Sequence, residues 1–183
     1  MHQDIEKILY SSEDLSKLVA CISDEIAEDY KGKSPVLIPI LKGSVMFFAD
    51  LVRKLPLDCT FDFMSATSYG SGTESSGNVM ITKDITIDIK GKDVIIVEDI
   101  LDTGNTLFYI KNYLNDKYEP ASIRICTLFD KPSRRKKDIK ADYSGDEVDD
   151  MFIVGYGLDF DENYRDLPYI GVLKPAGYKK TKE

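Results

Sequence analysis

The chain has little histidine and little cysteine. Its 183 residues include one histidine, His2, and three cysteines, Cys21, Cys59 and Cys126, which lie far apart and form no C-x-x-C pair. Disulfide frameworks and zinc sites need such residues at defined spacings, so we expect neither, and we interpret the cysteines as reduced, buried apolar residues. His2 lies in a terminus that we expect to be frayed. Any catalysis should therefore use carboxylates, lysine, tyrosine or backbone amides.

Long apolar runs and a net positive charge are also missing. No run approaches the about 20 apolar residues that cross a bilayer, which predicts no membrane partner. The opening segment MHQDIEKILYSSEDL lacks a basic region followed by an apolar one, so we expect a cytoplasmic protein. A net charge of -8 and a pI near 4.8 disfavour a nucleic-acid partner, because such binding relies on a basic surface. The basic run KPSRRKK, Lys131 to Lys137, is a local exception.

Helical and extended patterns alternate over what we expect to be a single domain of residues 1–183. Between Ser11 and Gly32, apolar residues follow helical spacing, with Ser11 and Asp14 as a capping box and Gly32 as the stop. Strand, loop and helix repeat at a spacing that predicts an α/β fold, with a central, mostly parallel sheet flanked by helices. We predict further helices at 44–55 and 105–117, and strands at 35–41, 59–66, 79–85, 93–98, 122–129, 151–156 and 169–173.

The stretch VIIVEDILDTGNTL, residues 94–107, predicts an anion site. A turn from a buried strand into a helix N-terminus binds anions, because unpaired N–H groups and the positive end of the helix dipole point into it. Gly104 permits close approach of the backbone, and Thr103 and Thr106 offer hydroxyl groups. These features suit a monophosphate.

Three acids accompany this turn: Glu98 at the end of the predicted strand, and Asp99 and Asp102 after it. Glu98 and Asp99 would repel a phosphate, so they more plausibly face hydroxyl donors or a hydrated Mg²⁺. A phosphorylated ribose meets all of these demands. The chain contains neither G-x-x-x-x-G-K-[ST] nor a G-x-G-x-x-G after a strand, which excludes a P-loop and a dinucleotide fingerprint. The alternative, three acids in a solvated turn, remains open for the stretch taken alone.

At this point the sequence resembles a known family. VIIVEDILDTGNTL is similar to the phosphoribosyl pyrophosphate signature of the type I phosphoribosyltransferases, and its Glu-Asp-x-x-Asp-Thr-Gly pattern resembles the hypoxanthine and hypoxanthine-guanine members. The likeness extends from about Pro35 to Leu173 and includes ILKGSVMFFADL, SYG, LFDK and FIVGYGLDFDENYRDLPYIGVL in the family's order. It implies the type I phosphoribosyltransferase fold, with a small hood formed by the N-terminal and C-terminal segments and a mobile lid at about 66–78. The Ser- and Gly-rich composition of residues 67–78 also fits a loop without function.

The resemblance implies a Mg²⁺-dependent transfer of the phosphoribosyl group from phosphoribosyl pyrophosphate to N9 of an oxopurine. Glu98 and Asp99 would bind the ribose hydroxyls, directly or through the metal, and Asp102 would be the general base or acid near N7. Asn105 departs from the family, where many relatives carry lysine, which removes a positive charge but not the backbone cradle. The implied ribose and phosphate set is Glu98, Asp99, Asp102, Thr103, Gly104, Asn105 and Thr106.

The remaining segments imply the base and pyrophosphate sites. Lys131 would donate to the purine 6-oxo group and Phe152 would stack on the base, whereas without the resemblance we would place Lys131 on an exposed rim and Phe152 in the core. The Leu41-Lys42 peptide is often cis in the family. The implied purine set is Lys131, Phe152, Ile153 and Asp159; the pyrophosphate set is Lys42, Gly43, Ser68, Tyr69 and Arg165; the metal set is Glu98, Asp99 and Asp159. Outside the resemblance, Asp159 and Arg165 could form an ordinary surface salt bridge.

Two other functions remain to be separated from this one. An RNA-binding regulator on the same fold is weakly favoured by the basic run and opposed by the acidic pI. A phosphohydrolase with a carboxylate-bound metal would need more ligands than the acidic turn supplies. The family also implies a homodimer or homotetramer.

Overall fold

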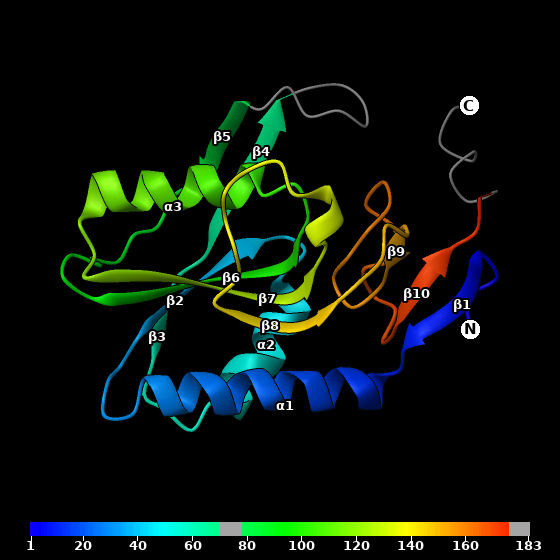
Figure 1. The fold of residues 1–183 in the computed structure, drawn as a ribbon, viewed down its shortest axis with the longest axis horizontal. Helices are drawn as coiled ribbons and strands as arrows, with labels where there is room; N and C mark the ends of the chain where they lie inside the picture. Colours follow the sequence, from blue (N-terminus) through cyan, green and yellow to red (C-terminus); the bar gives the residue numbers. More distant parts are fainter. Residues whose placement is uncertain (70–77, 176–183) are drawn as a thin grey trace.

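The computed structural model describes residues 1–69 and 78–175 (Figure 1). The first half of the chain forms β1 (Ile5–Tyr10), α1 (Ser12–Asp29), β2 (Val36–Leu41), α2 (Val45–Lys54), β3 (Thr60–Phe61), β4 (Met64–Tyr69) and β5 (Asn78–Lys83). The second half forms β6 (Asp93–Leu101), α3 (Asn105–Tyr118), β7 (Ser122–Asp130), the 3-10 helix η1 (Pro132–Arg134), β8 (Tyr143–Glu147), β9 (Ile153–Val154) and β10 (Ile170–Leu173).

The larger sheet has the strand order β5-β4-β2-β6-β7-β8, with β3 beside β2. All of its pairs are parallel except β4 with β5, so the predicted mostly parallel sheet is confirmed. After β2 the chain proceeds toward one edge of the sheet, and after β6 it proceeds through α3 toward the other edge. The neighbours β2 and β6 therefore form a switch point, where open α/β sheets bind their ligands.

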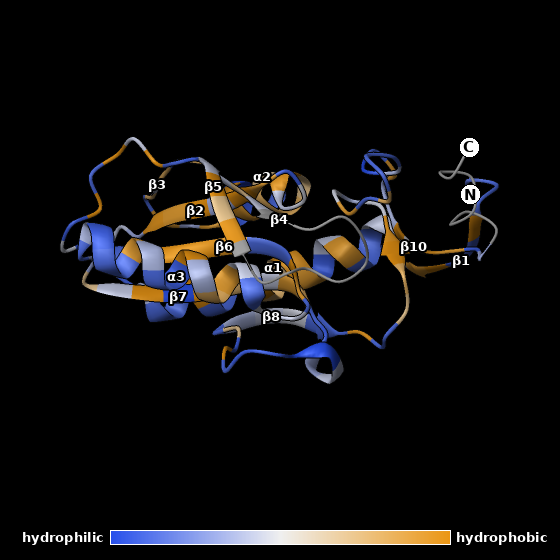
Figure 2. Ribbon diagram, turned by 90° about the horizontal axis from the view of Figure 1, so that it is seen from above, coloured by the Kyte–Doolittle hydropathy of each residue, from blue (hydrophilic) through white to orange (hydrophobic). Residues whose placement is uncertain are grey.

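Apolar side chains cover both faces of this sheet, because successive residues of a strand point to opposite sides. On one face Leu37 and Ile95 pack with α1 and α2, and on the other face Ile38 and Ile96 pack with α3. Figure 1 shows the resulting layers, with α3 above the sheet and α1 and α2 below it. In Figure 2 the hydrophobic colour follows β2 and the first part of β6, at the centre of the molecule.

The first helix begins as predicted and ends at Asp29, three residues before the predicted stop at Gly32. The Ser11 hydroxyl accepts from the Asp14 amide, and the Asp14 carboxylate accepts from the Ser11 amide, which completes the capping box. Gly32 follows the helix with a φ of 74°, a conformation that glycine adopts without steric cost.

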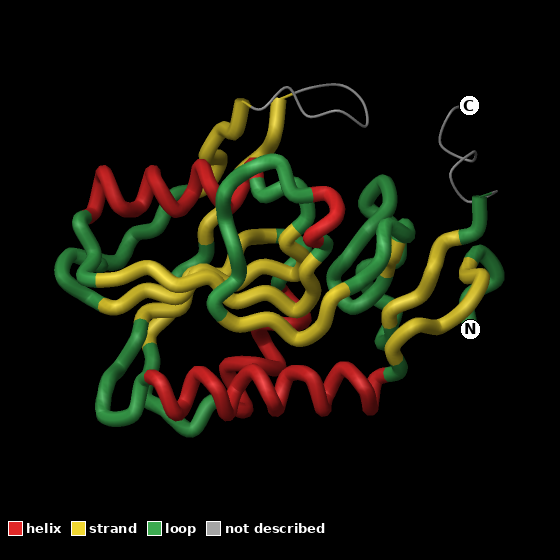
Figure 3. The backbone as a smooth tube through the Cα atoms, in the orientation of Figure 1, coloured by secondary structure: helices red, strands yellow, loops and turns green. Residues whose placement is uncertain are grey.

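A second, smaller sheet has the order β1-β10-β9 and joins the two ends of the described chain (Figure 3). The backbone amide of His2 donates to the Tyr169 hydroxyl at 2.8 Å, and the His2 ring meets Tyr164 edge-on at 5.3 Å. The expectation of a frayed terminus is therefore wrong. Neither β1 nor the polar edge strand β8 was predicted from the sequence.

Other boundaries differ for local reasons. The strand predicted at 151–156 is only Ile153–Val154, because the φ angles of Gly155, Tyr156 and Gly157 are positive and end the extended chain. The expected lid overlaps regular structure, since residues 66–69 and 78 belong to β4 and β5; residues 70–77 lie outside the described chain. The expectation of three buried cysteines is also wrong, because Cys21 is exposed and Cys59 is half-buried.

Candidate active site

The carboxyl ends of β2 and β6 lie side by side at the switch point. The two strands pair in parallel, with Val36 opposite Val94 and Pro39 opposite Val97. The chain that follows β2 and the chain that follows β6 therefore emerge at the same edge of the sheet. The first carries Lys42 and the second carries the acidic turn.

The acids Glu98 and Asp99 belong to β6 itself, which continues to Leu101. We had predicted that the strand ends at Glu98 and that Asp99 follows it. The strand is longer because β7 runs beside it over its whole length, with Thr127 of β7 opposite Glu98. Asp99 is consequently 9% exposed and Glu98 is half-buried.

Burial changes the acidity of both groups. It raises the pKa of Glu98 well above its ordinary value, and the adjacent Asp99 carboxylate raises it further. Burial also raises the pKa of Asp99, while hydrogen bonds and the charge of Arg165 act in the opposite direction. Two neighbouring carboxylates at low exposure are stable as anions when a cation or hydroxyl donors face them.

The segment after β2 is packed tightly against these acids. Gly43 lies directly on the Asp99 carboxylate, and the backbone of Gly157 lies directly on the Gly43 carbonyl, with no space for a side chain at either glycine. The Leu41-Lys42 peptide is cis, as is often the case in the resembling family. Three separate segments of the chain thus meet at Gly43.

The turn after β6 forms a small cavity. Gly104, with a φ of 81°, precedes the first residue of α3, and no side chain caps this helix. The cavity has a volume of about 200 Å³ and is lined by the turn and the end of the strand, at Glu98, Asp99, Ile100, Leu101, Asp102, Thr103, Gly104, Thr106 and Leu107. The uncapped amides and the threonine hydroxyls give this cavity the character of an anion site.

Residues of the basic run donate hydrogen bonds to the backbone carbonyls of the turn. Arg135 donates to the carbonyls of Leu101, at 2.9 Å, and of Asp102, and its other nitrogen pairs with Asp130. The backbone amide of Lys136 donates to the Thr103 carbonyl at 2.9 Å. The carbonyls of Leu101, Asp102 and Thr103 are thus engaged by the basic run, while the Asn105 amide donates to the Thr103 hydroxyl at 3.4 Å.

A larger cavity of about 540 Å³ adjoins the first and shares Ile100 and Asp102 with it. Its lining includes all four residues of the predicted purine set, Lys131, Phe152, Ile153 and Asp159. It also includes Ile100, Arg134, Asp150, Met151 and Leu158, which we did not predict. For Ile100 the sequence offered a signal, because this residue lies between the predicted site acids Asp99 and Asp102.

The two alternative interpretations of the purine set are wrong. Lys131 is 6% exposed and donates to the Met151 carbonyl at 2.6 Å, so it is not a rim residue. Burial lowers the pKa of its ammonium group, against the attraction of Asp102. Phe152 is 41% exposed, meets Phe160 edge-on at 5.3 Å and lines the cavity, so it is not a core residue.

Ion pairs join the residues expected at the pyrophosphate. Lys42 lies 2.8 Å from Glu162, and Arg165 lies 2.9 Å from Asp159 and 3.5 Å from Glu162. Glu162, which we did not predict, thus bridges the two cations. Ser68 ends up near the tip of β4, opposite Val79 of β5. Tyr69 is the last residue of β4, and both side chains are outside the described structure.

Within residues 1–69 and 78–175, no three histidine, cysteine, aspartate or glutamate residues form a group that could hold a metal ion by themselves. Glu98 and Asp99 are neighbours, whereas Asp159 is paired with Arg165. Any cation here would need oxygen ligands from a substrate or from water. Mg²⁺ commonly binds in this way.

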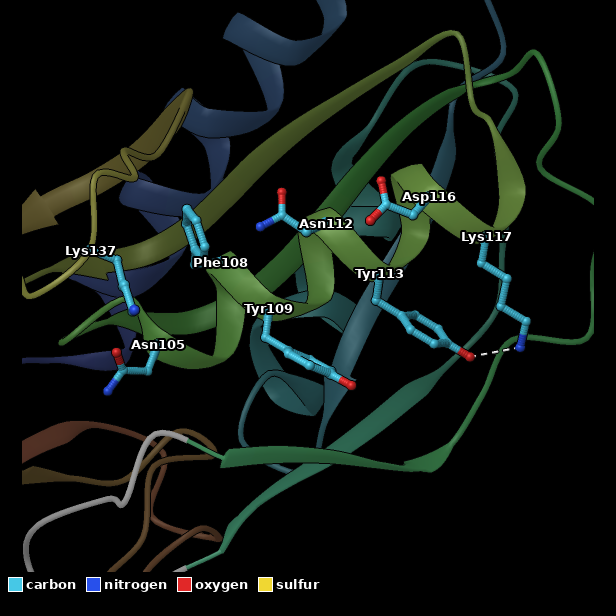
Figure 4. Close-up of a pocket in the computed structure, with 8 residues that line it drawn as sticks. All are labelled: Asn105, Phe108, Tyr109, Asn112, Tyr113, Asp116, Lys117 and Lys137. Carbon is cyan, nitrogen blue, oxygen red and sulfur yellow. Dashed lines mark hydrogen bonds between the residues drawn. The ribbon is translucent and has the colours of Figure 1, made fainter.

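A further groove of about 520 Å³ lies on the outer side of α3 (Figure 4). It shares only Asn105 with the predicted site and is lined by aromatic side chains such as Phe108, Tyr109 and Tyr113. None of the acids of the turn reaches it. In the described part of the chain, the predicted site acids thus line the two adjoining cavities at the switch point and not this groove.

Comparison with known proteins agrees with this geometry. Residues 7–161 match the model of the phosphoribosyl transferase domain, and the chain belongs to this family. The chain is 49% identical to a hypoxanthine-guanine phosphoribosyltransferase of Streptococcus thermophilus, over 98% of this chain and 99% of that one. It is equally identical to the Bacillus subtilis enzyme of the same name, with the same coverage. A crystal structure of a hypoxanthine phosphoribosyltransferase from Staphylococcus aureus superimposes with a TM-score of 0.93, at 47% identity over 97% of this chain and 96% of that chain.

None of the helices in the described part of the chain is long and apolar enough to cross a bilayer.

Proposed function

We propose that the chain is a purine salvage enzyme, which transfers the 5-phosphoribosyl group from phosphoribosyl pyrophosphate to N9 of hypoxanthine or guanine and yields IMP or GMP and pyrophosphate. The observation that carries this proposal is the junction of the two cavities at Ile100 and Asp102. A phosphate in the smaller cavity and a flat base in the larger one would place a ribose across that junction. The names of the similar enzymes support the same reaction.

Asp102 is the residue that we assign to proton transfer. In the proposed reaction the C1–O bond to pyrophosphate breaks, the C1–N9 bond forms, and the purine gives up its N7 proton to the Asp102 carboxylate. Asp102 lines both cavities, which is the position that this step requires. A well-placed general base contributes about 10²- to 10⁴-fold to the rate.

The larger cavity is assigned to the base. Lys131 can redirect its ammonium group from the Met151 carbonyl to the 6-oxo group of a purine, and Phe152 offers an exposed ring for stacking. Ile153 would add backbone contacts from β9. Adenine carries an amino group at position 6, which cannot accept from Lys131, so we expect it to be rejected.

Phosphoribosyl pyrophosphate would occupy the smaller cavity and the space toward Lys42. The amides and hydroxyls of the segment Asp102 to Thr106 would bind its 5′-phosphate, and Glu98 and Asp99 would bind its ribose hydroxyls. Lys42, Gly43 and Arg165 would face the pyrophosphate, with Ser68 and Tyr69 approaching from β4.

The residues present also fit Mg²⁺. Glu98 and Asp99 are adjacent, poorly exposed carboxylates whose pKa values burial raises, so a cation bound through substrate oxygens would relieve their repulsion. Asp159 could contribute from the pyrophosphate side. When bound, Mg²⁺ would neutralise the leaving pyrophosphate.

The two rival functions receive no support. The arginines of the basic run are paired within the protein, Arg134 with Asp102 and Asp150 and Arg135 with Asp130, which leaves fewer free cations for RNA. The described residues also lack the ligand cluster of a metal phosphohydrolase. A homodimer or homotetramer and a cytoplasmic location stay predictions.

The test is ultraviolet monitoring of nucleotide formation from hypoxanthine, guanine, xanthine or adenine with phosphoribosyl pyrophosphate and Mg²⁺. We expect turnover with hypoxanthine or guanine and none with adenine. Turnover should stop when a chelator removes Mg²⁺. Pyrophosphate release without any purine would refute the proposal and favour a hydrolase, and RNA retention on a filter at moderate salt would favour the regulator.

A further inference from the structure

Arg134 lies in the larger cavity and contacts two carboxylates at once. Its Nε lies 2.9 Å from Oδ1 of Asp102, and its Nη1 lies 3.0 Å from Oδ1 of Asp150. All three residues line the cavity that we assign to the base. Arg134 comes from η1, Asp102 from the turn after β6, and Asp150 from the segment between β8 and β9, so the guanidinium joins three separate parts of the chain.

We propose that Arg134 is a positioning residue for the reaction, which holds the Asp102 carboxylate toward the purine and is itself held by Asp150. This inference rests on the proposed function. From the sequence, the basic run was weighed only as weak support for an RNA-binding surface. Its geometry instead places one of its members against the group that we assign to proton transfer.

The shape of the guanidinium suits this task. Its planar fork donates a hydrogen bond to Asp150 through Nη1 and forms an ion pair with Asp102 through Nε, so one rigid group faces both carboxylates. A lysine could supply the charge but only from a single, freely rotating point. Arg134 also stays protonated throughout a turnover, so it can steady Asp102 both before and after the proton arrives.

A purely structural role explains less. Arg134 and Asp102 are 41% and 37% exposed, and ion pairs at such exposure contribute little to stability. The backbone of the turn is already held by Arg135, which donates to the carbonyls of Leu101 and Asp102. What remains for Arg134 to fix is the carboxylate of Asp102. Lys131, the other cation that lines this cavity, is directed toward the Met151 carbonyl.

Arg134→Gln tests the inference by steady-state kinetics. A misplacement of a reacting group by about 1 Å can cost about 100-fold in rate, so we expect kcat to fall by about 10- to 100-fold. The KM for phosphoribosyl pyrophosphate should stay within about twofold, because the phosphate turn keeps its own supports. Arg134→Lys should restore part of the lost kcat. Lys140→Gln, which removes an exposed charge from the same stretch of chain, should leave kcat unchanged.

The decisive measurement is the combination with Asp102→Asn. If Arg134 acts through Asp102, then Arg134→Gln should lower kcat by less than about threefold in that background, because coupled residues are not additive. Full multiplication of the two losses would overturn the inference, and so would a wild-type kcat in Arg134→Gln. If Arg134→Gln does not fold, as judged by its thermal unfolding, Arg134→Lys carries the test, and a wild-type kcat there would overturn two-point positioning. Absence of nucleotide formation by the wild-type protein would instead refute the proposed function.

Discussion

Gly43 and Asp99 touch where β2 and β6 end. A β-carbon on residue 43 would overlap the Asp99 carboxylate, both its Oδ2 and its Cγ. The segment that we assign to pyrophosphate and the acid that we assign to the ribose are thus in contact only because one of them has no side chain. A displacement of the segment at Gly43 would therefore also displace the Asp99 carboxylate, and the reverse holds as well.

Gly43→Ala should therefore disable the enzyme without unfolding it. The new methyl group must displace Asp99 or the segment after β2, so we expect a loss of at least about 100-fold in kcat/KM for phosphoribosyl pyrophosphate. Gly32→Ala is the control: no atom would contact its β-carbon, but its φ of 74° would strain an alanine. That variant should lose about 1 kcal/mol of stability and keep wild-type kinetics. Equal kinetic effects in both variants would contradict the contact with Asp99.

Asp102→Asn separates chemistry from binding. The amide keeps the shape of the side chain but cannot accept the purine proton in the same way, so kcat should fall by about 10²- to 10⁴-fold. The KM values for both substrates should change far less. Initial rates over a matrix of both substrate concentrations will measure this difference. Equal losses in turnover and in binding would count against the assignment of Asp102 as the acid-base group.

Phe152→Ala should weaken binding of the base. Stacking of a nucleic-acid base on an aromatic ring contributes about 1–3 kcal/mol, which corresponds to a rise of about 5- to 150-fold in the KM for hypoxanthine or guanine. The melting temperature should change little, because Phe152 is already 41% exposed. Phe61→Ala removes a ring that is 47% exposed on β3, away from both cavities, and should leave the KM values unchanged. An unchanged KM in Phe152→Ala would place the base elsewhere.

Asp62 should make the fold sensitive to acid. Burial alone would raise its pKa, but hydrogen bonds from the amide and hydroxyl of Thr86, the Phe63 amide and Lys83 outweigh it and lower the pKa from 3.8 to about 2. Since the folded-state pKa lies below the unfolded one, this stabilisation is present above pH of about 4 and is lost as the pH falls through about 2.

The comparison of Asp62→Asn with the wild type tests this stabilisation. Urea unfolding should show a deficit of up to about 2.5 kcal/mol in Asp62→Asn at pH 7, which narrows toward pH of about 2. Asp24→Asn replaces an exposed acid on α1 and should show no such dependence. A deficit that stays constant with pH would contradict the assigned cause.

The sequence predicted the parts of the fold that depend on local order. The capping box of α1, the all-apolar β2 and the turn at Gly104 each follow from a few neighbouring residues. It missed β1 and β8, since β1 pairs with β10 at the other end of the chain and β8, with the sequence YSGDE, is a polar edge strand. Neither pairing leaves a local signal.

Some features of the candidate site could likewise be predicted from neighbouring residues, and others could not. The acidic turn was visible because its chemistry is contiguous in the sequence, although the true end of β6 was not, since β7 extends the strand by pairing beside it. The contacts of Arg134 with Asp102 and Asp150 could not be predicted, because they join three segments that only the fold brings together. From composition alone, this arginine was only one member of a local basic run.

The pairing of β1 with β10 makes β9 depend on segments from opposite ends of the described chain. β9 carries Ile153 and directly follows Phe152. In the smaller sheet, β9 pairs with β10, and β10 pairs on its other side with β1. If the chain folds as it is synthesised, the turn that we assign to the 5′-phosphate can form early, whereas β9, beside the cavity that we assign to the base, must wait for its partner β10. We expect a nascent chain that still lacks β10 to bind a sugar phosphate but not a purine base.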